Sequence, residues 1–82
     1  MVENDNFDVF LRRLANAIIL RALCDLKKDK DSYVFRTARN FCLGLSPAWS
    51  ESLNLYCTIA DVSEEMVKHK ALEYIKNNKT RG

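Results

Sequence analysis

The sequence contains very few of the residues that interrupt regular structure, with only two glycines and one proline among 82 residues. An all-β chain needs a turn every ten residues or so, and its turns draw on these residues, so the composition excludes that class. The longest apolar stretch, 15–26, is broken by Asn16, Arg21 and Asp25, so we expect no membrane-spanning segment. At 48% apolar residues the chain is too apolar to be disordered. We therefore predict a single domain, 1–82, of the all-α class.

Cysteine and histidine are also scarce. Cys24, Cys42 and Cys57 lie 18 and 15 residues apart with no CxxC pair, and the single histidine, His69, stands between two lysines. Zinc ligands come in closer pairs, so we predict no metal site and no cofactor. Each cysteine has apolar neighbours, which favours a buried structural thiol over a reactive one. The unpaired cysteines, together with an acidic start to residues 1–20 that does not resemble a secretion signal, predict a cytoplasmic protein.

Residue sets that carry catalysis are missing as well. The sequence has no glycine-rich phosphate loop and no carboxylate pair in an apolar setting, and one histidine cannot serve a nucleophile–base–acid set. Glu64 and Glu65 are adjacent, so a helix points them to different sides. We therefore predict that the protein is not an enzyme.

Apolar residues at helical spacing are what the sequence does contain. We predict a first helix from near 4–6 to about Lys28, capped by Asp5 or Asn6. One face recurs at three- and four-residue steps: Phe7, Leu11, Leu14, Ile18, Ala22 and Leu26. A second side carries Val9, Ile19 and Leu23. A helix that is apolar on two sides is typical of a central element, and we expect this one to be central.

Three shorter helices are predicted from their capping residues. The second starts after Asp31 or Ser32 and ends near Gly44, which suits a left-handed C-terminal position. The third starts at Ser46-Pro47, and the fourth is capped by Ser63. We therefore expect a compact bundle of about four helices with short connections.

The last two helices fit a helix-turn-helix-like unit at 53–72. Such a unit needs a small residue at the helix contact, a positive φ in the turn, an apolar residue under the turn, a cap and an apolar anchor. The sequence supplies one residue for each requirement, in order: Cys57, Asp61, Val62, Ser63 and Val67. It departs from the usual pattern at Asp61, where glycine is common, and at Lys70, where a second apolar anchor is usual. Two simply packed helices would satisfy several of the same requirements.

Basic side chains are concentrated near the C-terminus, where the polar residues 77–82 are expected to fray. This distribution favours an anionic partner, although lysines also suit the negative end of a helix dipole. The candidates for DNA contact are Glu64, Glu65, Lys68, His69, Lys70 and Lys76, with Arg36 and Arg39 as secondary candidates. We expect Glu64, Glu65, Lys68 and His69 on the outer side of the fourth helix. The two arginines could instead pair with Asp29 or Asp31.

Two segments carry a resemblance to a known group of proteins. They are Ala38-Arg39-Asn40-Phe41-Cys42-Leu43-Gly44 and the stretch 53–68, which includes Tyr56-Cys57-Thr58-Ile59-Ala60-Asp61-Val62. Both resemble small phage- and prophage-encoded proteins with an Ala-Arg-x-Phe-Leu-Leu-Gly segment, a Trp-Cys-x-x-Ala-Gly-Leu segment and a basic final helix. The chain departs from that group at Tyr56, where the group has Trp, and at Asp61, where it has Gly. The resemblance implies a helix-turn-helix-like C-terminal half and a phage or mobile-element origin.

Two functions follow as hypotheses. The first is a DNA-binding regulatory protein that contacts double-stranded DNA through the helix-turn-helix-like unit. The alternative is a small helical adaptor or inhibitor that binds a host protein complex through an aromatic patch of Trp49, Phe35 and Tyr33, unless these side chains complete the core instead. The apolar first helix also makes a homodimer plausible.

Overall fold

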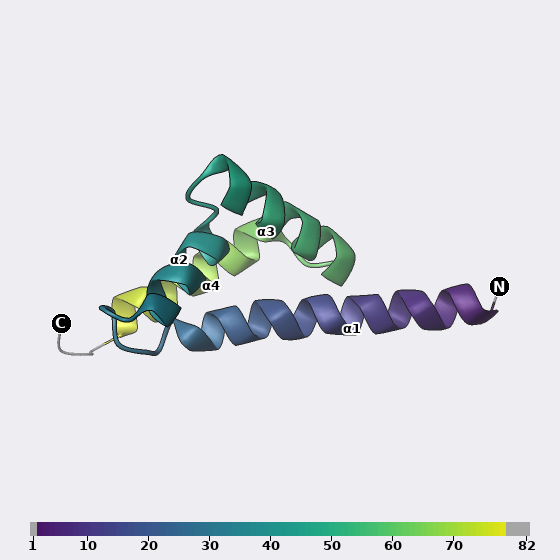
Figure 1. Ribbon diagram of the computed structural model, residues 1–82, viewed down its shortest axis with the longest axis horizontal. Helices are drawn as coiled ribbons and strands as arrows, with labels where there is room; N and C mark the ends of the chain where they lie inside the picture. Colours follow the sequence, from purple (N-terminus) through teal and green to yellow (C-terminus); the bar gives the residue numbers. More distant parts are fainter. Residues whose placement is uncertain (1, 79–82) are drawn as a thin grey trace.

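Four helices make up the computed structural model, which describes residues 2–78 and the side chains of residues 6–78. They are α1 (Val2–Asp25), α2 (Tyr33–Leu43), α3 (Pro47–Ala60) and α4 (Glu64–Asn77), and the described residues contain no strand. The predicted all-α bundle of about four helices is therefore confirmed. Figure 1 shows α2, α3 and α4 gathered on one side of the long α1.

Serine side chains cap the three shorter helices. The hydroxyl oxygens of Ser32, Ser46 and Ser63 each accept a hydrogen bond from the backbone N–H three residues later, at 3.0, 3.2 and 3.3 Å. Each cap satisfies one of the donors that a helix start leaves without an internal partner. Gly44 ends α2 in the left-handed conformation, at φ 58°. The predicted starts of these helices and the end of α2 are confirmed, with Ser32 and not Asp31 as the cap.

The boundaries predicted for the first helix are wrong at both ends. α1 begins at Val2, so Asp5 and Asn6 lie within the helix and do not cap it. It ends at Asp25, because the following N–H groups of residues 26–28 bond to carbonyls three residues back and tighten the chain into a turn.

The buried face of α1 also differs from the prediction. The side chains that enter the core are Ala15, Ile19, Leu23 and Leu26. Two residues of the predicted face, Phe7 and Leu14, are 59% and 47% exposed. The other three helices all contact α1, but they pack on one side of it and leave its N-terminal part uncovered, so the expected coverage of α1 on two sides is not found. Ile19 and Leu23, which were assigned to the second side, are buried, whereas Val9 of that side is 41% exposed. Of the predicted face, Leu26 is completely buried, and Ile18 and Ala22 are partly buried against the core.

The core is formed where α1, α2 and α3 meet, with α4 covering α2. The largest fully buried side chains are those of Leu26, Leu53, Cys42 and Cys57. Phe41 of α2 packs edge-to-face against Trp49 and Tyr56 of α3, with ring centroids 6.4 and 5.8 Å apart. This aromatic contact fixes α2 against α3.

The end of α4 is joined to the end of α1. The side-chain amide of Asn78 donates hydrogen bonds to the carbonyls of Leu26 and Lys28, at 2.7 and 2.9 Å. The ammonium group of Lys27 lies 5.2 Å from the ring centre of Tyr74, a cation–π distance. Residues 77 and 78 are therefore held, contrary to the prediction of a frayed end from 77, and the rest of that predicted segment, 79–82, lies outside the described residues.

Among the described residues, no helix has both the length and the apolar character that crossing a membrane requires. No group of three or more potential metal-ligating side chains is found in the same part of the chain.

The cysteines differ in their surroundings, and the prediction of three buried thiols is wrong for Cys24. Cys24 is exposed on α1, whereas Cys42 and Cys57 are buried. Burial, with smaller contributions from the nearby Cys57 and Asp25, raises the pKa of Cys42 from 9.0 to about 12. Burial is also the main cause of the raised pKa of Cys57.

We predict that Cys24 alone reacts rapidly with a thiol reagent near pH 8, since the other two thiols are protonated and shielded.

The raised pKa of Cys42 means that the folded protein keeps a proton that the unfolded chain loses above pH 9.0. The free energy of unfolding should therefore fall as the pH rises from 9.0 toward about 12. Urea unfolding in this pH range measures the effect.

Cys24→Ser is the control, because it removes the exposed thiol and should leave this pH dependence unchanged. Equal reaction rates for all three thiols in the folded protein would contradict the burial of Cys42 and Cys57.

Candidate nucleic-acid interface and apolar groove

The turn between α3 and α4 has the positive φ that a helix-turn-helix-like unit needs at this place. Asp61 ends α3 at φ 61° and ψ 47°, and it is the one non-glycine residue with positive φ among those described. The N–H groups of Asp61 and Val62 donate to the carbonyls of Thr58 and Cys57, at 3.2 and 3.0 Å. This pair of bonds is a Schellman motif, which closes a helix C-terminus. The predicted positive φ at Asp61 is confirmed.

Small and apolar residues pack beneath this turn. Cys57 and Val67 are each 2% exposed, and Val62 is partly buried against the core. Lys70 is exposed where a second anchor was expected, but the next residue, Ala71, is completely buried and takes that role. The anchor positions of the unit are thus filled, with the last one displaced by one residue.

The solvent side of α4 carries what we call the outer stripe: Glu65, His69, Leu72 and Lys76. These residues follow one another at helical spacing, and all four are exposed. The last three, together with Glu73, line a shallow depression of about 350 Å³. The outer stripe therefore combines a carboxylate, an imidazole, an apolar side chain and a cation on one accessible surface.

Two of the predicted contact residues do not lie on that side. Glu64 is half-buried, and its carboxylate accepts a hydrogen bond from the amide of Asn54 on α3. Lys68 is also half-buried, and its charge acts on Cys57 of α3, whose pKa it lowers against the larger effect of burial. Both side chains are turned toward α3, since they neighbour the buried anchor Val67 on the helix surface.

Of the remaining candidates, Lys70 and Arg36 have local partners. Lys70 is exposed and forms an ion pair with Glu73, at 3.7 Å, on α4 itself. Arg36 on α2 is exposed, and its guanidinium donates to the backbone carbonyl of Asp31 at 2.8 Å, rather than to a carboxylate as the alternative proposed. Arg39 is half-buried, and its Nε is buried with no hydrogen-bond partner.

Basic residues from two distant segments meet at the C-terminal end of α4, which the sequence did not indicate. Because Asn78 bonds to the carbonyl of Lys28, the last turn of α4, with Lys76, lies beside the loop that carries Lys27 and Lys28. Nothing in the sequence marks this association, since the residues are about 50 positions apart. The leading end of α4, in contrast, carries Glu64 and Glu65.

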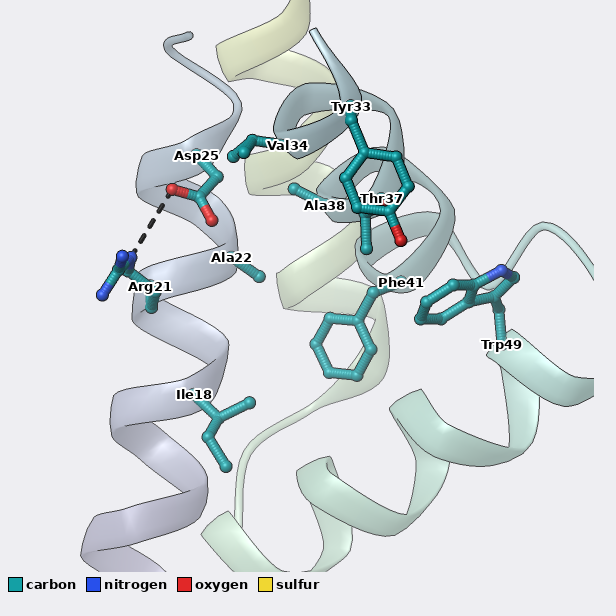
Figure 2. A pocket seen from close by; sticks show the side chains of 10 residues that line it. All are labelled: Ile18, Arg21, Ala22, Asp25, Tyr33, Val34, Thr37, Ala38, Phe41 and Trp49. Carbon is teal, nitrogen blue, oxygen red and sulfur yellow. Dashed lines mark ion pairs between the residues drawn. The ribbon is translucent and has the colours of Figure 1, made fainter.

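An apolar groove lies between α1 and α2, with one wall from α3 (Figure 2). Its volume is about 310 Å³, and Tyr33, Phe41 and Trp49 stand across it from Ile18 and Ala22. Its further lining residues are Arg21, Asp25, Val34, Thr37 and Ala38. The groove is mostly apolar, with one polar edge formed by an ion pair.

Two of the three residues predicted for the aromatic patch line this groove. Trp49 is half-buried and Tyr33 is 75% exposed, and both line the groove. Phe35 is 3% exposed, so its prediction as an interface residue is wrong. It lies on the core side of α2, one residue away from the exposed Val34.

Comparison with protein-family models, with curated proteins and with solved structures finds no match to this chain.

We predict that Asp61→Gly stabilises the fold by about 1 kcal/mol, because the left-handed conformation is strained for a residue with a Cβ and free of that strain for glycine. Chemical denaturation of the variant and the parent measures the change.

Gly44→Ala is the matched control at the other left-handed position, and it should destabilise by roughly 1–2 kcal/mol. Its new Cβ would lie 3.2 Å from the Cα of Ser50, in addition to the backbone strain. A loss of stability in Asp61→Gly would show that the aspartate side chain itself holds the turn.

Proposed function

We propose that this protein binds double-stranded DNA through α4 of its helix-turn-helix-like unit and acts as a regulatory protein. The observation that carries the proposal is the turn at Asp61, with its positive φ and with Cys57, Val67 and Ala71 buried on the two helices that it joins. This arrangement holds one helix against another so that the second can enter a major groove. The resemblance to small phage-encoded proteins supports a role in a phage or mobile element.

The outer stripe offers chemistry suited to reading bases. The carboxylate of Glu65 can accept a hydrogen bond from the amino group of cytosine, and Leu72 can contact the methyl group of thymine. His69 supplies a ring nitrogen as donor or acceptor. Lys76, joined by Lys27 and Lys28, supplies positive charge for the phosphate backbone.

The charge distribution sets the kind of binding to expect. Acidic residues at the leading end of α4 repel phosphates, so affinity for DNA of arbitrary sequence should be low. Base contacts must then provide much of the preference for a particular site. We therefore infer a binder that depends on sequence more than on net charge.

Lys76→Ala should weaken duplex binding about fivefold at about 50 mM salt and reduce the slope of log affinity against log salt by about 1, as for the loss of one phosphate contact. The measurement is fluorescence anisotropy with a labelled duplex selected by this protein from a random pool.

The control is Arg13→Ala, which removes one equally positive, exposed side chain from α1. It should change the affinity less than twofold. Equal losses of duplex affinity in both variants would mean that binding depends only on the net charge of the protein and not on the position of Lys76. Failure to select any duplex would overturn DNA binding by this chain.

The groove favours a second candidate function, the binding of a helix of a host protein. Its apolar walls are exposed at Tyr33 and Val34, and its edge carries the ion pair of Arg21 and Asp25, at 3.6 Å. An apolar groove with a polar edge fits one amphipathic helix, whose apolar side enters the groove while its polar side faces the edge.

Trp49, the single tryptophan, lines this groove and reports its occupation. An apolar dye that fluoresces on binding, such as anilinonaphthalene sulfonate, should quench the fluorescence of Trp49 by energy transfer. Val34→Glu places a charge at the groove and should weaken dye binding about tenfold, on the basis of the cost of burying a charge. Leu45→Glu is the control, because it changes a similarly exposed side chain outside the groove and should have little effect on dye affinity. Equal losses of dye affinity in the two variants would mean that the dye does not bind in the groove.

A further inference from the structure

The uncovered part of α1 carries a heptad pattern. Phe7, Phe10, Leu14 and Ala17 follow one another at steps of three, four and three residues, which is the spacing of a coiled-coil seam. We call these four residues the α1 seam. Phe7 and Phe10 are each 59% exposed and Leu14 is 47% exposed, and Ala17 is exposed as well. The core of the protein uses a different side of α1, through Ala15, Ile19 and Leu23.

The exposed surface of the chain is larger than a compact monomer requires. The solvent-accessible area is 5906 Å², whereas a compact chain of this mass exposes about 5,000 Å². The radius of gyration is 13.9 Å, against about 11.7 Å for a compact domain of this length. The excess area, on the order of 900 Å², is close to the ~800 Å² that each partner buries in a stable protein interface. The extension of α1 beyond α3, visible in Figure 1, accounts for the elongated shape.

We propose that the α1 seam binds the seam of a second copy of this chain, with the two α1 helices antiparallel. In this orientation Phe10 of one copy packs against Leu14 of the other, and Phe7 packs against Ala17. Each large side chain thus meets a smaller one, and the arrangement fills space evenly along the seam. Because the pairing is the same from either copy, the interface is closed by twofold symmetry and the assembly stops at a dimer.

A parallel pair fits less well. It would stack phenylalanine on phenylalanine at two levels and alanine on alanine at a third, which leaves a void. The next seam position along the heptad is Arg21, and a parallel pair would place the two Arg21 side chains opposite each other. The antiparallel dimer avoids both problems. The proposal does not rest on DNA binding, since the seam and the outer stripe of α4 belong to different helices.

The test compares two neighbouring exposed residues of α1. Sedimentation equilibrium of the full chain over about 5–200 µM should give a mass of twice 9.5 kDa that dissociates on dilution. Phe10→Glu should weaken the dimer at least about a hundredfold, because a charge would be buried at two equivalent levels. Val9→Glu is the control, since Val9 is 41% exposed but faces away from the seam, and it should change the dimer constant less than about threefold.

Both variants alter side chains outside the core, so helical content by circular dichroism should equal that of the parent. A parent chain that stays at 9.5 kDa throughout the range would overturn the proposal. Equal weakening by the two variants, or none by Phe10→Glu, would also overturn it.

Cys24 provides a test of orientation, because it is the exposed thiol among the described cysteines. In the antiparallel pair the two Cys24 residues lie at opposite ends, roughly 36 Å apart at a helical rise of about 1.5 Å per residue. In a parallel pair they would lie at one level of the seam, roughly 10 Å apart. Double electron–electron resonance between spin labels on Cys24 separates the two, and the short distance would overturn the antiparallel arrangement.

Discussion

The packing of three short helices against one long helix is the constraint on which the rest of the structure depends. α1 has 24 residues, whereas α2, α3 and α4 have 11, 14 and 14. The shorter helices must also cover one another, so they reach only part of α1 and leave its N-terminal part bare. Both the elongated shape and the exposed side chains of Phe7 and Phe10 follow from this mismatch in length.

The same packing explains how the last two helices are held in place. Phe41 of α2 fixes α3 through Trp49 and Tyr56, and Asn78 fixes the end of α4 to the end of α1. The turn at Asp61 then determines the angle between α3 and α4. The outer stripe is left exposed because the apolar residues of α4 are used on the opposite side, at Val67 and Ala71.

The two apolar surfaces of the molecule are related through α1. The seam ends at Ala17, and the groove begins at Ile18 and continues along α1 through Ala22 to Asp25. A second copy that covers the seam would therefore stop near the mouth of the groove and leave most of it open. In such a dimer the outer stripes of two α4 helices would be carried by one assembly, which is how helix-turn-helix proteins commonly read paired half-sites.

Local hydrogen bonding is what the sequence by itself determined. The serine caps, Gly44 and the positive φ of Asp61 depend on groups within five residues of each other, so residue types alone predicted them. Only the tertiary structure decided which side of α1 is buried, why Glu64 and Lys68 turn toward α3, and that Lys28 lies beside the end of α4. Apolar periodicity offered two sides of α1, and the choice between them was made by helices far along the chain, whose contacts local sequence does not encode.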